Sequence, residues 1–133
     1  MTYLLDVNAL LALGFQQHEF HGRVVSWVVR EKQLLLLATC SITELGFVRV
    51  LTQAPAYGFT IAHARTLLLD LKKADAPAFT FVADSHDVSR LPAWVKSGKQ
   101  ITDGHLLQLA RANEAILATL DEKIPDAFLI PHK

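Results

Sequence analysis

Four carboxylates stand at points of the sequence where a chain of alternating strands and helices gathers side chains. Asp6 ends an apolar run and leads directly into a helix-like pattern. Glu44 and Asp103 each fall in the first turn of a predicted helix, and Asp121 ends a later apolar run. Ligands of open α/β sheets bind at the carboxyl ends of the strands. If the strands that carry them are neighbours, we expect these four side chains to converge at one edge of the sheet.

Carboxylates that share a pocket repel one another, and burial raises their pKa values. A bound divalent cation relieves that repulsion. Oxygen ligands without a nearby Cys or His favour Mg²⁺ or Mn²⁺ over Zn²⁺. Such an ion bridges carboxylates, water and phosphate oxygens, and it activates water for in-line attack on phosphorus. The pattern therefore predicts metal-dependent hydrolysis of a phosphate ester.

Each acid also fits an ordinary structural role. Asp6 fits a helix N-cap, and the segment from Ser41 to Glu44 fits a capping box in which Glu44 bonds back to the Ser41 amide. Asp103 follows Thr102, a predicted cap, in a first turn where the helix dipole favours acids. Asp121, together with Glu122, fits a solvated turn. Only the joint occurrence of the acids favours a functional site.

The elements that must position these acids alternate along the chain. Strands are expected at 3–5, 34–38, 79–82, 115–120 and 128–130, and helices at 7–17, 19–32, 41–52, 61–73 and 103–113. This order predicts an α/β fold with a mostly parallel sheet of about five strands, right-handed crossovers and helices on both faces. With no linker in the sequence, residues 1–133 are expected to form one domain.

Composition restricts the class of protein. The chain is 51% hydrophobic with a formal net charge of +0, so it is a globular protein that needs a local basic patch to bind a polyanion. Its single cysteine, Cys40, lies in an apolar run and fits a buried thiol in a reducing compartment. We see neither a signal peptide nor the ~20-residue apolar stretch of a membrane span. We therefore expect a cytoplasmic protein with no membrane partner.

Four segments of the sequence together resemble a known family. They are Leu4-Leu5-Asp6-Val7-Asn8-Ala9-Leu10-Leu11, Thr43-Glu44-Leu45, Thr102-Asp103-Gly104-His105-Leu106-Leu107 and Ala118-Thr119-Leu120-Asp121. Their order and spacing resemble the PIN domain and, more narrowly, the VapC-type ribonuclease toxins of bacterial toxin–antitoxin pairs. The resemblance implies a three-layer α/β/α domain and Mg²⁺- or Mn²⁺-dependent endonucleolytic cleavage of RNA.

The resemblance also assigns roles to residues. Asp6 and Asp103 correspond to the main metal ligands, Asp121 lies close to the metal, and Glu44 holds or orients a metal-bound water. The supporting polar residues are Asn8 and Thr119. Asp84 lies outside the pattern, since its strand is expected toward the sheet edge. The sequence departs from the commonest form at Gly104, where Ala is more usual, and at Glu122, an acid that makes a one-residue shift of the fourth assignment conceivable.

RNA binding requires further cations and stacking groups. The segment before Asp103 is predicted to be exposed and contains Arg90, Trp94, Lys96 and Lys99. The cations could hold phosphates and Trp94 could stack on an unpaired base, or this segment is a solvated loop with Trp94 folded into the core. Arg49, on the same predicted helix as Glu44, is a second candidate.

The family resemblance implies a homodimer and a small cognate antitoxin that blocks the acidic pocket. The apolar residues Phe47, Val48 and Leu51, or those between Phe59 and Leu71, are candidates for these contact surfaces, and core packing is the alternative. His18 and His21 are three residues apart but are expected to be ordinary surface histidines, with no further ligand evident.

Two other functions remain open on the sequence. A haloacid-dehalogenase-like phosphatase also begins with a strand ending on Asp, but its chemistry normally requires a second Asp two positions later, where this chain has Asn8. A non-catalytic protein-binding PIN module has no need of four converging carboxylates. Cleavage of RNA, or of a small phosphomonoester, distinguishes the first two functions.

Overall fold

The chain alternates strands and helices over most of its length, and the computed structural model describes residues 1–132. Lys133, the last residue of the predicted domain, lies outside the described residues. The strands are β1 (Thr2–Leu5), β2 (Leu36–Cys40), β3 (Ala78–Val82), β4 (Ile116–Thr119) and β5 (Phe128–Leu129). The α-helices are α1 (Val7–Gly14), α2 (His21–Glu31), α3 (Ser41–Gln53), α4 (Ile61–Lys72) and α5 (Ile101–Ala112). Short 3-10 turns cover Pro55–Tyr57, Val88–Arg90 and Gly98–Gln100.

The five strands form one sheet in the order β3-β2-β1-β4-β5, and all neighbouring pairs are parallel. This confirms the predicted fold class. β1 is central: Leu4 pairs with Ala38 of β2 on one side and with Leu117 of β4 on the other. The chain order therefore reverses across β1. A reversal of this kind opens a crevice at the carboxyl ends of the strands.

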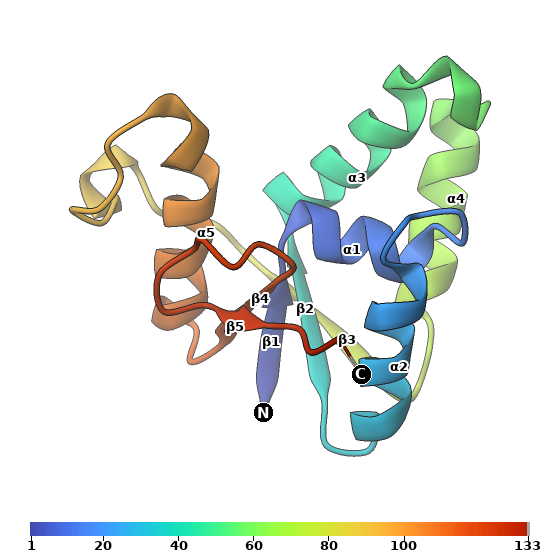
Figure 1. Ribbon diagram of the computed structural model, residues 1–133, viewed down its shortest axis with the longest axis horizontal. Helices are drawn as coiled ribbons and strands as arrows, with labels where there is room; N and C mark the ends of the chain where they lie inside the picture. The colour runs from blue at the N-terminus through green and yellow to red at the C-terminus, as the bar shows by residue number, and fades with distance from the viewer. Residues whose placement is uncertain (133) are drawn as a thin grey trace.

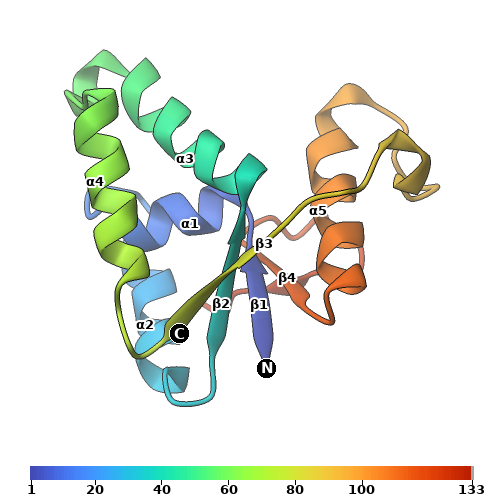
Figure 2. The same cartoon turned by 180° about the vertical axis from the view of Figure 1, so that it is seen from behind.

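Helices cover both faces of the sheet, as predicted. α1 to α4 lie on one side and α5 on the other (Figures 1 and 2). Alternate residues of β1 belong to different cores, because successive side chains of a strand point to opposite faces. Leu5 packs in the core with Leu10 and Phe47, whereas Leu4 packs in the core with Leu106. β1 is therefore covered on both faces and its end is held firmly in place.

Two predicted helix caps are wrong, although the predicted start of α3 at Ser41 is correct. α5 begins at Ile101 with Gln100 as its N-cap, so Thr102 is not the cap. α3 has Cys40 at its N-cap, and the Cys40 amide donates to Thr43 Oγ1 at 3.0 Å. Thr43 thus takes the place that the predicted capping box gave to the side chain of Glu44, which leaves that side chain free for other contacts.

The predicted partner surface on α3 is also wrong in part. Phe47 and Leu51 are 0% exposed and belong to the core of this chain, so they are not available to a second molecule. In α4, by contrast, Ile61 and Leu69 expose large apolar side chains. Among the described residues, no helix is both long enough and apolar enough to span a bilayer.

Candidate functional site

A cleft of about 380 Å³ lies beyond the carboxyl end of β1, between α3 and α5. Its lining includes three carboxylates from three elements far apart in the sequence: Asp6 follows β1, Asp103 lies in the first turn of α5, and Asp121 follows β4. The remaining lining residues are Val7, Asn8, Leu11, Val50, Thr102 and Leu106. Parallel pairing of β1 with β4 brings Asp6 and Asp121 to the same edge.

Asp6 is the innermost of the three carboxylates and is only 7% exposed. Its Oδ1 accepts from the Ala9 amide at 2.8 Å and caps α1, while its Oδ2 accepts from Thr119 Oγ1 at 2.6 Å. Thr119 Oγ1 in turn accepts from the Asp121 amide at 3.0 Å. A single hydroxyl therefore ties the carboxylate of Asp6 to the backbone of Asp121 and fixes the spacing between them.

The site carries unrelieved negative charge. Burial raises the pKa of Asp6 to about 6; hydrogen bonds from Thr119 and Ala9 act against this, and the charges of Asp103 and Asp121 add to it. Burial, and then the charge of Asp121, also raise the pKa of Asp103. The three carboxylates are thus close enough to act on one another, and a cation in the cleft would favour their ionised forms.

Asn8 is held in the lining by a histidine from the loop between α1 and α2. His18 Nδ1 accepts from the Phe20 amide at 3.0 Å. The other ring nitrogen, Nε2, must then carry the proton of the neutral ring, and it donates to Asn8 Oδ1 at 2.8 Å. The NH₂ group of Asn8, which lines the same cleft as Asp6, is left as a donor. His21 instead contacts the Ala12 carbonyl, so the two histidines do not form a joint site.

Glu44 does not line the cleft with the three aspartates. Its Oε2 lies 2.5 Å from Lys72 Nζ and accepts from Thr39 Oγ1 at 2.6 Å. The side chains of Lys72 and Glu44 are 21% and 22% exposed, so this is a largely enclosed ion pair. The structure therefore gathers three of the four predicted acids and pairs the fourth with a lysine from the end of α4.

The lining suits a hard divalent cation by the chemistry of its ligands, which are the carboxylate oxygens of three aspartates. Among residues 1–132, however, no three His, Cys, Asp or Glu side chains stand close enough together to hold an ion as they are. Mutual repulsion of carboxylates favours such an open arrangement. Asp6, Asp103 and Asp121 are the residues that would hold the ion.

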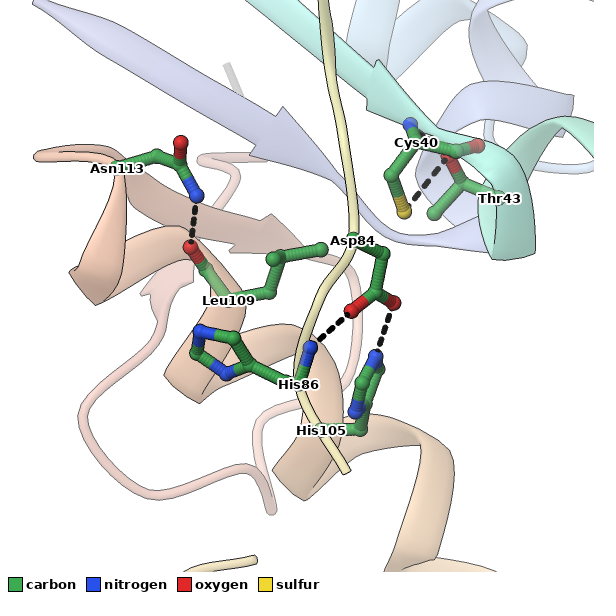
Figure 3. A network of polar contacts seen from close by, with 7 residues as sticks. All are labelled: Cys40, Thr43, Asp84, His86, His105, Leu109 and Asn113. Carbon is green, nitrogen blue, oxygen red and sulfur yellow. Dashed lines mark hydrogen bonds and ion pairs between the residues drawn. The ribbon is translucent and has the colours of Figure 1, made fainter. Parts of the chain in front are cut away.

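Two other acids of the sequence, Asp84 and Glu122, lie outside the cleft. Asp84, just beyond the edge strand β3, accepts from the His86 amide at 3.0 Å, and its second oxygen pairs with His105 Nε2 (Figure 3). The lowered pKa of Asp84 reflects these contacts, which outweigh desolvation. His105 accordingly points away from the cleft. Glu122 is exposed and does not line the cleft, which favours Asp121 over its neighbour.

The candidate RNA-binding residues separate into different environments. Trp94 is partly buried against the core under α5, which favours the structural alternative for this residue. Arg49, Arg90 and Lys96 are exposed and do not line the cleft. Lys99 lines a second depression that borders Asp103 and Asp121.

The sequence pattern does not single out His18, Lys72 or Lys123 as functional residues. In the structure His18 contacts Asn8, Lys72 contacts Glu44, and Lys123 lies beside the cleft. His18 is expected from the sequence to be an ordinary surface histidine, and no local pattern indicates that Lys72 approaches Glu44. For Lys123, its position two residues after Asp121 was the one available signal.

Comparison with known proteins agrees with this geometry. No family model matches the chain. The chain is 40% identical over 123 residues to ribonuclease VapC38 of Mycobacterium tuberculosis, covering 89% of this chain and 84% of that protein. It is 37% identical over 130 residues to ribonuclease VapC44 of the same species, covering 93% and 89%. These relatives give no support to the phosphatase alternative.

A solved structure shows the same fold. The crystal structure of VapBC2 from Rickettsia felis bound to a DNA fragment from their promoter matches with a TM-score of 0.65 at 14% identity, over 97% of both chains. The fold, the acidic cleft and the identity to these ribonucleases over most of their length lead to one assignment. The chain belongs to the VapC family of PIN-domain ribonucleases.

Proposed function

We propose that this protein is an endoribonuclease toxin of a type II toxin–antitoxin pair and that it hydrolyses RNA phosphodiesters with Mg²⁺ or Mn²⁺ in its acidic cleft. The observation that carries the proposal is the convergence of Asp6, Asp103 and Asp121 on one cleft at the reversal point of the sheet. Residues 1–133 form the nuclease domain in this proposal, and its cytoplasmic location stays a prediction.

The residues that line the cleft have different roles in the proposed hydrolysis. A divalent cation in the cleft would draw in the scissile phosphate and favour ionisation of a water for attack. Asp6, fixed by Ala9 and Thr119, would set the depth at which the ion is held. Asp103 and Asp121 lie nearer to solvent and would complete the set of ligands. The amide group of Asn8, oriented by His18, would donate to a phosphate oxygen.

In this proposal Glu44 is the fourth acidic residue of the site, although it does not line the cleft. Its carboxylate accepts from Lys72 and Thr39, so it would reach the cleft only by giving up those partners. Its contribution to the reaction should therefore be smaller than that of an aspartate in the lining.

The proposed protein partners are a cognate antitoxin and a second copy of this chain. Support for the antitoxin comes from family membership and from the VapBC2 structure, in which the related chain belongs to a VapBC assembly. The exposed apolar residues of α4, Ile61 and Leu69, are better placed for such contacts than the buried residues of α3.

The test is cleavage of a mixed-sequence RNA by the purified protein with Mn²⁺, with Mg²⁺ and with EDTA. We expect cleavage with either ion and none with EDTA. Asp103→Asn should reduce the rate about 100-fold or more, the scale of loss when a charged group at a reaction centre is removed. Asp70→Asn is the matched control, because Asp70 is a 64% exposed acid on α4.

Glu44→Gln should retain more activity than Asp103→Asn, because Glu44 lies outside the lining. Cleavage that persists in EDTA, or an unchanged rate in Asp103→Asn, would contradict the proposed function. Equal losses in Glu44→Gln and Asp103→Asn would instead show that Glu44 reaches the reacting group directly.

A further inference from the structure

A second depression, of about 340 Å³, lies against the acidic cleft. Asp103 and Asp121 line both spaces, so these two side chains form the wall between them. The lining of the second space also includes Lys99 and Lys123, with Ser97 and Gln100 beside them. We refer to this space, defined by these residues, as the lysine depression.

The two spaces differ in charge. The acidic cleft is lined by three aspartates and by no Lys or Arg, whereas the lysine depression adds two lysines to the shared aspartates. Within residues 1–132 neither Lys99 nor Lys123 takes part in an ion pair. In the same part of the chain no ion pair joins Asp103 or Asp121 to a lysine or an arginine. Two unpaired cations therefore border the site at which a metal ion would be held.

Both lysines stand on backbone that side chains hold in place. Gln100 Oε1 accepts from the Lys96 amide at 2.7 Å and from the Ser97 amide at 3.2 Å, which closes the turn that carries Lys99. Asp121 Oδ1 accepts from the Lys123 amide at 2.9 Å, which ties the second lysine to a cleft aspartate. The turn after Lys123 is anchored by Ile124, which is only 8% exposed.

We propose that the lysine depression is a phosphate-binding subsite that holds a backbone phosphate of single-stranded RNA next to the scissile one. The inference rests on the proposed function. A polymer with its scissile phosphate in the acidic cleft passes the shared wall of Asp103 and Asp121, and its neighbouring phosphate then meets Lys99 and Lys123. The shared wall makes the RNA strand the fitting occupant, because one continuous polyanion can fill both spaces.

The subsite does more than add affinity. Phosphate contacts fix the register of a nucleic acid on a protein without reading its bases. A subsite on one side of the cleft therefore sets the direction of the strand. Which phosphate is held, on the 5′ or the 3′ side of the cut, follows from the experiment.

The test uses an RNA oligonucleotide that the wild-type protein cuts at one position. Lys99→Ala/Lys123→Ala should raise KM about tenfold or more with kcat little changed, because hydrogen bonds to charged groups carry that scale of free energy. It should also lower the slope of log affinity against log salt by about one or two. The matched control is Lys32→Ala/Lys73→Ala. It also removes two positive charges, but from exposed positions at the ends of α2 and α4.

Neutral methylphosphonate linkages locate the phosphate. One such linkage next to the cut should raise the KM of the wild-type protein to that of the double variant. The KM of the double variant should not change. Two results would overturn the subsite: a wild-type KM and salt slope in Lys99→Ala/Lys123→Ala, or an equal loss in the control variant. If the wild-type protein cuts no RNA with any ion, the proposed function itself fails. RNA binding with Ca²⁺ then tests the lysine depression separately, by the same two variants.

Discussion

The two carboxylate oxygens of Asp6 have different roles, one in capping a helix and one in the cleft. The sequence left open whether it caps a helix or belongs to a site, and the structure shows that the two are compatible: Oδ1 caps α1, while Oδ2 faces Thr119. The cap positions the carboxylate without using all of its lone pairs, since each oxygen accepts more than one bond. A structural role for an acid is therefore no argument against a functional one.

The raised pKa of Asp6 predicts a pH dependence of stability in the absence of divalent ions. Its folded-state pKa of about 6 lies above the ordinary value of 3.8, so the folded protein binds the proton more tightly than the unfolded chain. The resulting stability is fully present below about pH 4 and is lost as the pH rises through 6. The free energy involved is on the order of 3 kcal/mol. Urea denaturation between pH 4 and pH 7 measures it.

Asp6→Asn is the control for this prediction, because an amide does not titrate. The variant should lack this pH dependence and be more stable than the wild-type protein at pH 7. The pKa values of Asp84 and Asp87 are lowered and act in the opposite sense, so only the difference between the two proteins isolates Asp6. If the free energies of unfolding of the two proteins changed with pH in parallel, the pKa of Asp6 would not be raised in the folded protein.

The three cleft aspartates could be predicted because backbone position alone places them. An acid that ends a strand, or opens the helix before one, reaches the carboxyl edge whatever its rotamer. Glu44 could not be predicted in the same way. Its direction depends on Lys72, which is 28 residues away on another helix, and on Thr39, and sequence patterns do not report such contacts.

Gly104 in α5 marks the place where another segment crosses the helix. A Cβ at this position would lie 2.4 Å from Val95 Cγ2 and 3.1 Å from Pro92 Cδ. The departure from Ala noted in the sequence therefore has a physical cause, since the segment before α5 packs directly on its backbone. Ala would gain about 1 kcal/mol of helix propensity, which overpacking is expected to exceed.

Gly104→Ala should lower the free energy of unfolding by about 1–3 kcal/mol, as overpacked substitutions do. Gly22→Ala is the matched helix variant, because a Cβ there meets nothing within 4 Å. It should raise the free energy of unfolding by about 0.4–1 kcal/mol. Urea denaturation of both variants checks the pair. Equal effects of the two substitutions would show that the contacts of Val95 and Pro92 do not constrain α5.

Element types could be predicted better than element boundaries. Every predicted strand and helix exists, because apolar periodicity and alternation report burial. The start of α5 was placed too late, since the 3-10 turn Gly98–Gln100 runs directly into Ile101. A polar stretch with Pro92 and Gly98 carries no periodic signal, so the packing of 84–100 on α5 could not be read from it.

The last strand, β5, is short and lies at the edge of the sheet. Ile130, just after β5, is 0% exposed, and its amide donates to the Thr119 carbonyl at 2.9 Å. Its own carbonyl accepts from Arg23 Nε at 3.0 Å and Nη2 at 2.6 Å, which ties the chain end to α2. Because β5 flanks β4, this closure also supports the strand that carries Thr119.

Ile130→Ala should therefore lower the free energy of unfolding by about 2–5 kcal/mol, the usual range for truncation of a buried aliphatic side chain. Leu129→Ala is the control at the neighbouring position, the last residue of β5, because Leu129 is 37% exposed. We expect a much smaller loss for it. Chemical denaturation monitored by tryptophan fluorescence compares the two. A similar loss in both variants would mean that the end of the chain is not a fixed part of the core.

The parallel sheet and its two covering layers could be predicted from the alternation of elements. The alternation does not predict that β1 and β4 are neighbours in the sheet. Strand order depends on long-range packing, which no local pattern encodes. The position of β3 at the edge, which removes Asp84 from the site, agreed with the expectation for that strand.

The central place of β1 has a consequence during translation. Asp6 and Thr119 meet across 113 residues of chain, and Asp121 comes later still. A nascent polypeptide whose residues 116–121 are still inside the ribosome lacks both the strand that pairs with β1 and one wall of the acidic cleft. Contacts this distant along the chain also slow folding. Any activity that needs the complete cleft therefore begins only after residues 116–121 have left the ribosome.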